Sequence, residues 1–366
     1  MATGQDKYVQ FIDIQKSYDG ETLVVKDLNL SIRRGEFLTM LGPSGSGKTT
    51  TLLMLAGFEV PTHGRIMLDG RPIDNMPPHK RNIGMVFQNY ALFPHMTVEE
   101  NLAFPLEVRK IPKAEQQTKI KRALEMVKLA AFGKRRPGQL SGGQQQRVAV
   151  ARALVFEPQL VLMDEPLGAL DKQLREQMQL EIKHIHHDLG VSIVYVTHDQ
   201  SEALTMSDRI AVMNAGVIEQ VGDGKTIYDQ PATAFVASFV GENNPFPGKV
   251  LRADNGTAIV ETAFGALRGR NAGGLRAGDQ AILFVRPESL RLGQGGADTT
   301  IGSNVLNVAF EGNASHIFLK GAGKKDITLT VGRHDGAAIP EQGSAAAVSY
   351  DPDLGLVLPE GKMASE

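Results

Sequence analysis

The chain contains a glycine-rich segment made of residue types that bind phosphate. Residues 42–49, Gly-Pro-Ser-Gly-Ser-Gly-Lys-Thr, match the pattern Gly-x-x-x-x-Gly-Lys-Ser/Thr. Phosphate oxygens must approach several backbone N–H groups together, and glycine permits both the backbone angles and the close contact. The lysine adds a positive charge at the β- and γ-phosphates, and the threonine hydroxyl can bind Mg²⁺. The residues expected to bind ATP here are Gly42, Pro43, Ser44, Gly45, Ser46, Gly47, Lys48, Thr49 and Thr50.

Two carboxylates follow an apolar segment further along the chain. Residues 160–163, Leu-Val-Leu-Met, are typical of a buried strand, and Asp164 and Glu165 come directly after them. A strand end would place Asp164 beside the phosphate loop, where it can hold Mg²⁺ through water. Glu165 could then polarise the attacking water as general base. Together with the loop, the two carboxylates predict hydrolysis of ATP.

Three further features separate the classes of protein that share such a loop, which include kinases, GTPases and transport ATPases. Gln88 and His198 each follow an apolar, strand-like run, so each could reach the γ-phosphate region. Residues 141–144 can present a hydroxyl and bare N–H groups at the start of a helix, which makes a second anion site. Taken alone, Gln88 or His198 would be more typical of an ordinary polar loop residue, and residues 141–144 would be typical of a capped helix start. These four residues are Ser141, Gly142, Gly143 and Gln144.

Strand-like and helix-like segments alternate over the first two thirds of the chain. Residues 36–41 and 192–196 are typical of buried strands, and the first of them leads into the phosphate loop. Apolar residues between positions 174 and 189 recur at spacings of four, four, three and four, which places them on one face of a helix. This alternation predicts a mostly parallel sheet with helices on its faces.

The character of the sequence changes near Gly241. Residues 241–248, Gly-Glu-Asn-Asn-Pro-Phe-Pro-Gly, are rich in turn formers and predict a linker. Beyond it, short apolar segments are separated by glycine-rich breaks, and helical periodicity is scarce. We therefore expect a small all-β domain over residues 244–358. It follows an ATP-binding domain over residues 1–240, with a helical subdomain at about 89–158.

The composition limits the classes of function. Lys and Arg number 39 and Asp and Glu number 41, so the net charge of −2 gives no electrostatic case for binding nucleic acid. The absence of cysteine excludes disulfides and cysteine-based metal sites. No apolar stretch approaches the ~20 residues of a membrane-spanning helix, and the N-terminal segment lacks the pattern of a secretory signal. If the protein acts at a membrane, we expect it to act through a partner.

In this order, the motifs resemble those of the nucleotide-binding subunit of an ATP-binding cassette (ABC) transporter. The resemblance implies an α/β P-loop NTPase cassette with a helical subdomain, followed by an OB-like β-barrel. It also implies a homodimer with two ATPs, in which residues 141–144 of one copy close over the ATP held at Lys48 of the other. It makes Glu165 the catalytic base. His198 would stabilise the γ-phosphate, and Gln88 would sense Mg²⁺ and the attacking water.

The resemblance assigns further residues of the nucleotide site. Asp171 stands where the family couples the two sites across the dimer interface. Tyr18 occupies the position of the aromatic ring that stacks on adenine, with Val24 packing nearby. The residues implied for Mg²⁺ are Thr49, Gln88 and Asp164.

Residues 81–102 resemble the segment that grips a short helix of the membrane permease in importers of this family. Residues 90–95 would line that groove, although a surface loop beside an apolar core is the alternative interpretation. Residues 286–288 and 310–312 match recurring pieces of the small β-barrels of importers for maltose, polyamines, ferric iron, sulfate and molybdate.

Within that group, residues 140–154, 165–171 and 239–243 are most similar to those of spermidine/putrescine-type importer ATPases. The similarity implies a peripheral protein at the cytoplasmic face of the inner membrane. Its partners would be two transmembrane permease subunits and, indirectly, a periplasmic solute-binding protein. Because this subunit does not touch the cargo, ferric iron, sugars and other organic ions stay open as alternatives. A soluble ABC ATPase of DNA repair or translation and a P-loop kinase are the rival classes.

Overall fold

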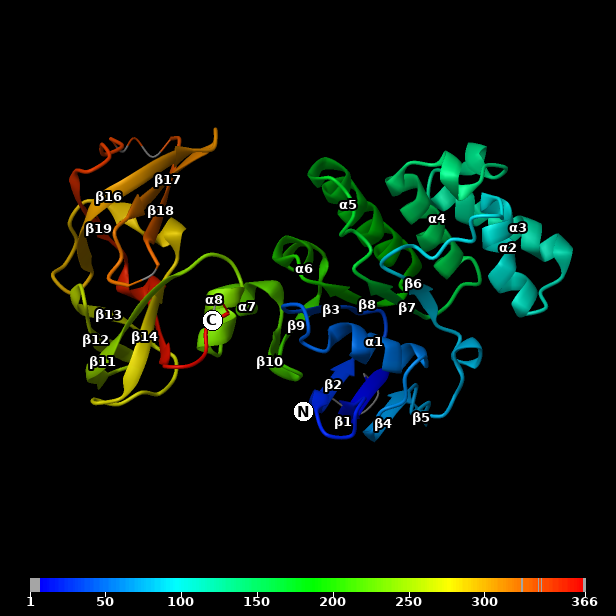
Figure 1. Ribbon diagram of the computed structural model, residues 1–366, viewed down its shortest axis with the longest axis horizontal. Coiled ribbons are helices and arrows are strands. Elements are labelled where there is room, and N and C mark those ends of the chain that lie inside the picture. Colours follow the sequence, from blue (N-terminus) through cyan, green and yellow to red (C-terminus); the bar gives the residue numbers. More distant parts are fainter. Residues whose placement is uncertain (1–6, 324, 335, 337, 365–366) are drawn as a thin grey trace. The chain divides into compact units, whose positions relative to one another are not determined.

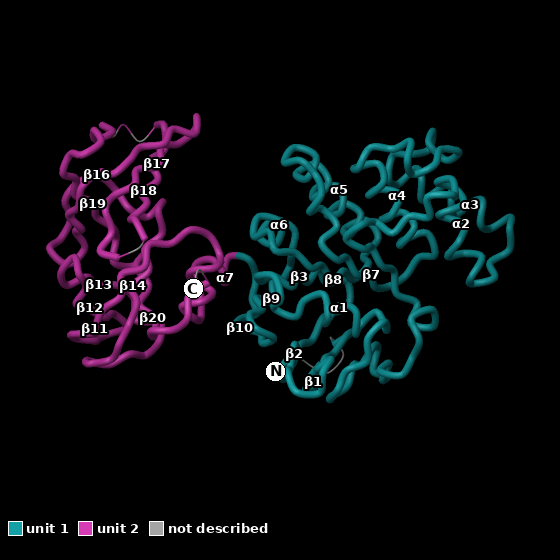
Figure 2. The backbone as a smooth tube through the Cα atoms, in the orientation of Figure 1, with its two compact units in different colours: residues 1–224 teal, residues 225–366 magenta. Residues whose placement is uncertain are grey.

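The computed structural model describes residues 7–364 except 324, 335 and 337. Residues 1–6, the start of the ATP-binding domain predicted from the sequence, lie outside the described residues. The chain divides into two compact units, residues 1–224 and 225–366 (Figure 2). This division assigns residues 225–240 to the second unit, whereas the sequence predicted a boundary between residues 240 and 244.

Unit 1 is built on a six-stranded sheet with the strand order β10-β9-β3-β8-β7-β6. Strands β6, β7, β8, β3 and β9 pair in parallel, and β10 pairs with β9 in the antiparallel sense. A second, four-stranded sheet has the order β2-β1-β4-β5. The strands of unit 1 are β1 (Val9–Ser17), β2 (Leu23–Ile32), β3 (Phe37–Leu41), β4 (His63–Leu68), β5 (Arg71–Pro72), β6 (Gly84–Val86), β7 (Leu160–Asp164), β8 (Ser192–Thr197), β9 (Arg209–Asn214) and β10 (Val217–Gly222).

The central strands of this sheet are buried on both faces. Alternate residues of a strand point to opposite faces, and here each face is covered by another layer of the protein. Leu38 and Met40 of β3 share a core with the second sheet and with Leu52 of α1. Phe37 and Tyr195, on the opposite face, pack with α4 and α5. The helices of unit 1 are α1 (Lys48–Ala56), α2 (Val98–Val108), α3 (Lys113–Met126), α4 (Gly142–Leu154), α5 (Lys172–Leu189) and α6 (Gln200–Met206), with 3-10 helices at Pro78–Lys80, Ala130–Phe132 and Pro137–Gln139.

Helices α2, α3 and α4 gather beside β6 (Figure 1) and share an apolar core of their own. Helix α2 begins with a capping box, because the Thr97 side chain accepts from the N–H of Glu100 and the Glu100 carboxylate accepts from the N–H of Thr97. In α5, Met178 and Ile182 are buried as the periodicity predicts, whereas Leu189 in its last turn is 43% exposed. Within the described part of the chain, every helix is too short or too polar to span a membrane.

Unit 2 contains a closed barrel, β11-β12-β13-β20-β14, and a five-stranded sheet with the order β15-β19-β16-β17-β18. The apolar residues of both share one core. Ala234 and Ala237 of α8 are buried against Phe284 of β14 and Leu358 of β20, which explains why this helix groups with unit 2. The helices of unit 2 are α7 (Gly224–Asp229) and α8 (Ala234–Phe239), with 3-10 helices at Pro287–Ser289 and Pro352–Leu354. Its strands are β11 (Asn244–Asp254), β12 (Thr257–Thr262), β13 (Gly265–Asn271), β14 (Gln280–Val285), β15 (Arg291–Leu292), β16 (Thr300–Phe310), β17 (Ala314–Leu319), β18 (Ile327–Gly332), β19 (Ala345–Ser349) and β20 (Leu356–Pro359).

Candidate functional site

The predicted phosphate loop joins β3 to α1 and opens into a cavity of about 320 Å³. Residues 44–50 line this cavity together with Val24, Gln88 and Glu165. Gly42 and Gly47 of the loop could not be replaced by larger residues, one because of a neighbouring backbone atom and the other because of its own backbone angle. A Cβ on Gly42 would lie 2.2 Å from the carbonyl oxygen of Met213, and Gly47 has a φ of 94°. The first turn of α1 lines the cavity, and N–H groups in the first turn of a helix have no partner within that helix, as an anion site requires.

Lys48 lies inside the loop rather than in solvent. Its Nζ donates to the carbonyl oxygens of Gly42 and Pro43 at 2.8 and 2.9 Å. Burial lowers the pKa of Lys48, while the nearby carboxylates of Glu165 and Asp164 act in the opposite direction. A bound phosphate group would add further negative charge at this ammonium and stabilise its charged form.

Thr49 and Asp164 form the pair of oxygen donors that the sequence predicts for Mg²⁺. Thr49, in the first turn of α1, donates its hydroxyl to Asp164 Oδ1 at 3.0 Å, and Asp164 is the last residue of β7. Burial raises the pKa of Asp164, the bond from Thr49 lowers it, and neighbouring Glu165 raises it further. Among the described residues, no cluster of three or more histidines or carboxylates could hold an ion alone. A hydroxyl and one carboxylate fit a Mg²⁺ ion that takes its other ligands from phosphate and water.

Gln88, Glu165 and His198 meet at one carboxylate oxygen. The Gln88 Nε2 group donates to Glu165 Oε2 at 3.2 Å, and His198 Nδ1 lies 3.3 Å from the same oxygen. The three residues follow β6, β7 and β8, which are neighbours in the sheet, so the carboxyl ends of these strands bring them together. Glu165 has a φ of 43°, a backbone conformation that few non-glycine residues adopt.

The segment of residues 141–144 begins α4 as a capping box. Ser141 Oγ accepts from the N–H of Gln144 at 3.4 Å, and the Gln144 side chain accepts from the N–H of Ser141 at 3.0 Å. A Cβ on Gly143 would lie 2.8 Å from the side chain of Leu174, so this helix start packs closely on α5. None of residues 141–144 is among those that line the cavity at the phosphate loop of the same chain.

Three predicted residues remain, and only Val24 among them lines the phosphate cavity. Asp171 is the N-cap of α5, where its side chain accepts from the N–H of Leu174 at 2.9 Å. Val24 of β2 lines the phosphate cavity. Tyr18 follows β1, is 58% exposed and lies with its ring 4.8 Å from Lys16 Nζ, outside the cavity lining.

Residues 90–95, the predicted permease groove, are held by two side chains that the sequence analysis missed. Arg152 of α4 donates to the carbonyl oxygens of Tyr90 and Ala91 at 2.9 and 2.7 Å. Asn101 of α2 accepts from the N–H of Phe93 and donates to its carbonyl oxygen. Tyr90 and Ala91 both have positive φ, so this turn depends on its supports. The sequence carried no signal for either residue, because it does not show which polar side chain on a helix is buried.

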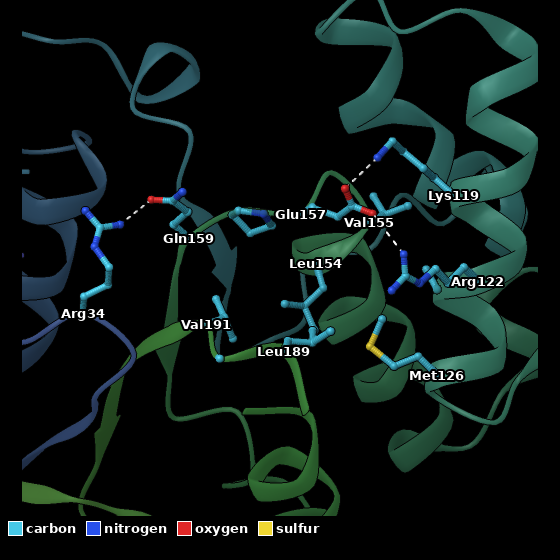
Figure 3. A pocket seen from close by; sticks show the side chains of 13 residues that line it. Arg34, Lys119, Arg122, Met126, Leu154, Val155, Glu157, Gln159, Leu189 and Val191 are labelled. Carbon is cyan, nitrogen blue, oxygen red and sulfur yellow. Dashed lines mark hydrogen bonds and ion pairs between the residues drawn. The ribbon is translucent and has the colours of Figure 1, made fainter. Parts of the chain in front are cut away.

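A larger cavity, of about 450 Å³, lies at the opposite edge of the sheet, where β7 and β8 begin (Figure 3). In it, Glu157 pairs with Lys119 at 2.9 Å and with Arg122 at 3.6 Å, while Arg34 donates to Gln159. Apolar residues of α3, α4 and α5 form much of the remaining lining. None of the site residues predicted from the sequence lines this cavity.

Comparison with known proteins assigns both units to families. The profile of the ABC transporter family matches residues 25–168, and that of the TOBE domain matches residues 283–358. The spermidine/putrescine import ATP-binding protein PotA of Rubrobacter xylanophilus is 45% identical over 358 residues, which cover 97% of this chain and 94% of the relative. The protein of the same name from Thermobifida fusca is 44% identical, with coverage of 98% and 96%.

Solved structures resemble the cassette. The protein cbiO1 from Clostridium perfringens, described as part of the ABC transporter complex cbiONQ, matches with a TM-score of 0.57 and 30% identity over 61% of this chain and 90% of that chain. The dimeric ATP-binding cassette MJ0796, bound to ADP and Pi, matches with a TM-score of 0.54 and 35% identity over 59% and 98%. The fold class predicted from the sequence is confirmed. The chain therefore belongs to the ABC transporter family and is one of its ATP-hydrolysing subunits.

Proposed function

We propose that this chain powers an ABC importer for polyamines of the spermidine and putrescine type. The observation that carries the proposal is the meeting of Gln88, Glu165 and His198 beside the phosphate loop, because these groups can activate water next to a bound γ-phosphate. The cargo is supported by relatives of that name which align with nearly the whole chain. Ferric iron, sugars and other organic ions are the alternative cargoes.

In this proposal the loop of residues 42–50 binds the phosphates of ATP through its N–H groups and Lys48. Thr49, Asp164 and Gln88 would hold Mg²⁺, and the ion would offset the negative charge of the phosphate oxygens when bound. Tyr18 stacks on the adenine ring, with Val24 beside it. The support for the metal is the Thr49–Asp164 hydrogen bond, which puts two oxygen donors at the edge of the phosphate cavity.

Glu165 acts as the general base for the attacking water. Gln88 and His198 both contact Oε2 of this carboxylate, so Oε1 is the oxygen we assign to accept the proton of water. The two contacts orient the carboxylate, and the His198 imidazole stabilises the γ-phosphate as it is transferred.

A second copy of the chain completes each site. Residues 141–144 do not line the phosphate cavity of their own chain, although they carry the hydroxyl and N–H groups of an anion site. We propose that they close over the ATP of the partner copy, with Asp171 at the interface between the two sites. A solved cassette that is 35% identical is dimeric, which supports this arrangement.

The dimer is proposed to lie at the cytoplasmic face of the inner membrane, beneath two permease subunits that receive cargo from a periplasmic binding protein. The groove of residues 90–95 would take a permease helix. Arg152 supports this assignment, because it ties the groove to α4, the helix that begins at the proposed ATP-closing segment. Closure over ATP could thus be passed to the groove through one rigid helix.

The catalytic part is tested with Glu165→Gln. The amide keeps the shape of the side chain but cannot accept a proton, so we expect loss of turnover by about 10²–10⁴-fold with ATP binding retained. Because ATP is then bound without being consumed, the variant should also form a stable ATP-dependent dimer in size-exclusion chromatography. Full ATPase activity in this variant would refute the assignment of the base.

The transport part is tested by reconstituting the chain with its permeases and binding protein in vesicles. ATP-dependent uptake of spermidine or putrescine is expected, and uptake of ferric iron or a sugar instead would overturn the cargo. Phe93→Ala removes the groove aromatic that packs on Phe104 at 4.7 Å between ring centres. It should lower uptake while leaving ATPase activity in place, whereas unchanged uptake and permease binding would count against the groove.

A further inference from the structure

Glu202 is a buried carboxylate directly beneath the loop that carries His198. It lies in α6 and is 2% exposed. Its Oε2 accepts from the hydroxyl groups of Tyr195 and Thr197, both on β8 and both at 2.7 Å. Thr197 Oγ1 in turn accepts from the N–H of Asp199 at 3.0 Å. The residues on either side of His198 are therefore anchored to one fixed group.

Arg175 of α5 contacts this anchored loop and a second segment together. One terminal nitrogen of its guanidinium donates to Asp199 Oδ2 at 2.9 Å, and the other donates to the carbonyl oxygen of Leu170 at 3.1 Å. Its Nε is 4.0 Å from Glu202 and is buried without a hydrogen-bond partner among the described residues. The guanidinium is thus positioned by its two terminal contacts and by the charge of Glu202.

The two contacts fall next to two proposed site residues. Leu170 immediately precedes Asp171, and Asp199 immediately follows His198. The other oxygen of Asp199 accepts from the N–H groups of Ser201 and Glu202 and caps α6, so Asp199 cannot turn away from Arg175 without uncapping that helix. A planar guanidinium therefore sets the spacing between the Asp171 segment and the His198 loop.

We propose that Arg175 is a positioning residue that makes the placement of His198 depend on the Asp171 segment. This inference rests on the proposed function, in which Asp171 faces the second copy and His198 faces the γ-phosphate. When the second copy moves the backbone at Leu170, Arg175 carries that shift to Asp199 and so to His198. Hydrolysis at one site then depends on the presence of the partner.

The buried side of this network is rigid enough to transmit such a shift. Burial raises the pKa of Glu202, the bonds from Thr197 and Tyr195 lower it, and the charges of Asp199 and Arg175 act in opposite directions. Burial together with Glu202 raises the pKa of Tyr195, so its hydroxyl stays a donor. The hydroxyl groups of Tyr195 and Thr197 are both bonded to this one buried carboxylate, which limits the arrangements that the three side chains can adopt.

The test compares Arg175→Met and Arg175→Lys with a matched control, Arg209→Met. Arg209 pairs with buried Glu36 at 3.1 Å, and its side chain is 27% exposed against 30% for Arg175. Unlike Arg175, it lies where a strand begins, as the first residue of β9. We expect both Arg175 variants to lower kcat by about 10- to 100-fold, with KM for ATP changed by less than about threefold. The control should keep its kcat per folded molecule.

Arg175→Lys tests whether the two contacts of the guanidinium, to Asp199 and to Leu170, are both needed. Lysine keeps the positive charge but cannot make both contacts in this geometry. A normal kcat in Arg175→Lys would overturn the proposal. So would a fall in kcat that is equally large in Arg209→Met, since that would reflect general loss of packing. Thermal unfolding of each variant gives the folded fraction used in the comparison.

A double-mutant cycle tests whether Arg175 acts through His198. In a His198→Ala background, Arg175→Met should lower kcat further by less than about twofold. An equal factor in both backgrounds would overturn the proposal. Failure of the proposed ATPase function would give a different result from failure of the Arg175 proposal. Either the wild-type protein would not hydrolyse ATP, or Glu165→Gln would stay fully active.

Discussion

The two edges of the six-stranded sheet in unit 1 differ in chemistry although the same strands reach both. At the carboxyl edge, the residues after β7 and β8 form the cluster of Glu165 and His198 beside the phosphate loop. At the amino edge, where these strands begin, lies the larger cavity, with Lys119 and Arg122 paired to Glu157 (Figure 3). Size alone would select the wrong edge.

The direction of the chain explains the difference. At the carboxyl edge, strand β3 leads through the phosphate loop into the N-terminus of α1, whose N–H groups and positive dipole end favour anions. At the amino edge, the chain arrives from the ends of α4 and α5, which present carbonyl oxygens. Catalytic groups in parallel sheets therefore collect at one edge, and basic residues at the other edge do not by themselves make a phosphate site.

The largest contrast between the edges is expected from their lysines. Lys48→Met should lower kcat/KM for ATP by about 10²–10³-fold, because it removes a charged donor from the phosphates in a partly buried site. Lys119→Met removes a lysine that pairs with exposed Glu157 in the larger cavity, and kcat/KM should change by less than about twofold. Steady-state ATPase assays measure both. Similar losses in the two variants would remove the distinction between the edges.

A hydroxyl at each edge gives the next contrast. Thr49→Val removes the donor to Asp164 and a proposed Mg²⁺ ligand, so the Mg²⁺ concentration for half-maximal ATPase activity should rise about tenfold or more. Ser192, at the amino edge, accepts from the N–H of Gly35 at 2.8 Å. Ser192→Ala should cost ~1–2 kcal/mol of unfolding free energy with the Mg²⁺ dependence unchanged. An unshifted Mg²⁺ titration in Thr49→Val would argue against this ligand.

The sequence allowed much of the carboxyl edge to be predicted, because its residues follow strands directly. Glu165, Gln88 and His198 were each placed by the apolar run before them, and parallel strands then bring such positions together. Arg175 and Glu202 were missed for the opposite reason. Their partners lie on other elements, and the pattern of a helix does not tell which polar residue on it is buried.

Unit 2 shows the limit of pattern analysis in another way. The short strands and glycine breaks predicted an all-β domain. Unit 2 contains such a domain, made of the closed barrel and the five-stranded sheet. The sequence put helix α8 in the first domain, because the turn formers that predicted the linker begin only at Gly241. Its alanines pack on Phe284 and Leu358, which lie far away in sequence. Long-range pairing of this kind sets domain membership, and no local signal carries it.

Buried Glu202 gives a smaller, pH-dependent contrast at the carboxyl edge. Burial raises its pKa above the ordinary 4.5, so between pH 4.5 and the raised pKa the native state holds a proton that the unfolded state has released. The free energy of unfolding therefore falls as pH rises through this window. In Glu202→Gln, this decrease of the unfolding free energy with rising pH should be absent. Urea unfolding at a series of pH values measures it. An identical slope in wild type and variant would contradict the buried titration.

The smallest effect is expected from Arg122→Ala in the larger cavity. Its side chain is 72% exposed and lies 3.6 Å from Glu157, and an exposed pair of this kind contributes about 0–1 kcal/mol. We expect kcat within about twofold of wild type and a change in unfolding free energy of less than about 1 kcal/mol. A tenfold loss of kcat with normal stability would break the comparison. It would mean that the amino edge takes part in turnover, since a loss of packing or of an exposed ion pair lowers stability before it lowers the rate of a folded enzyme.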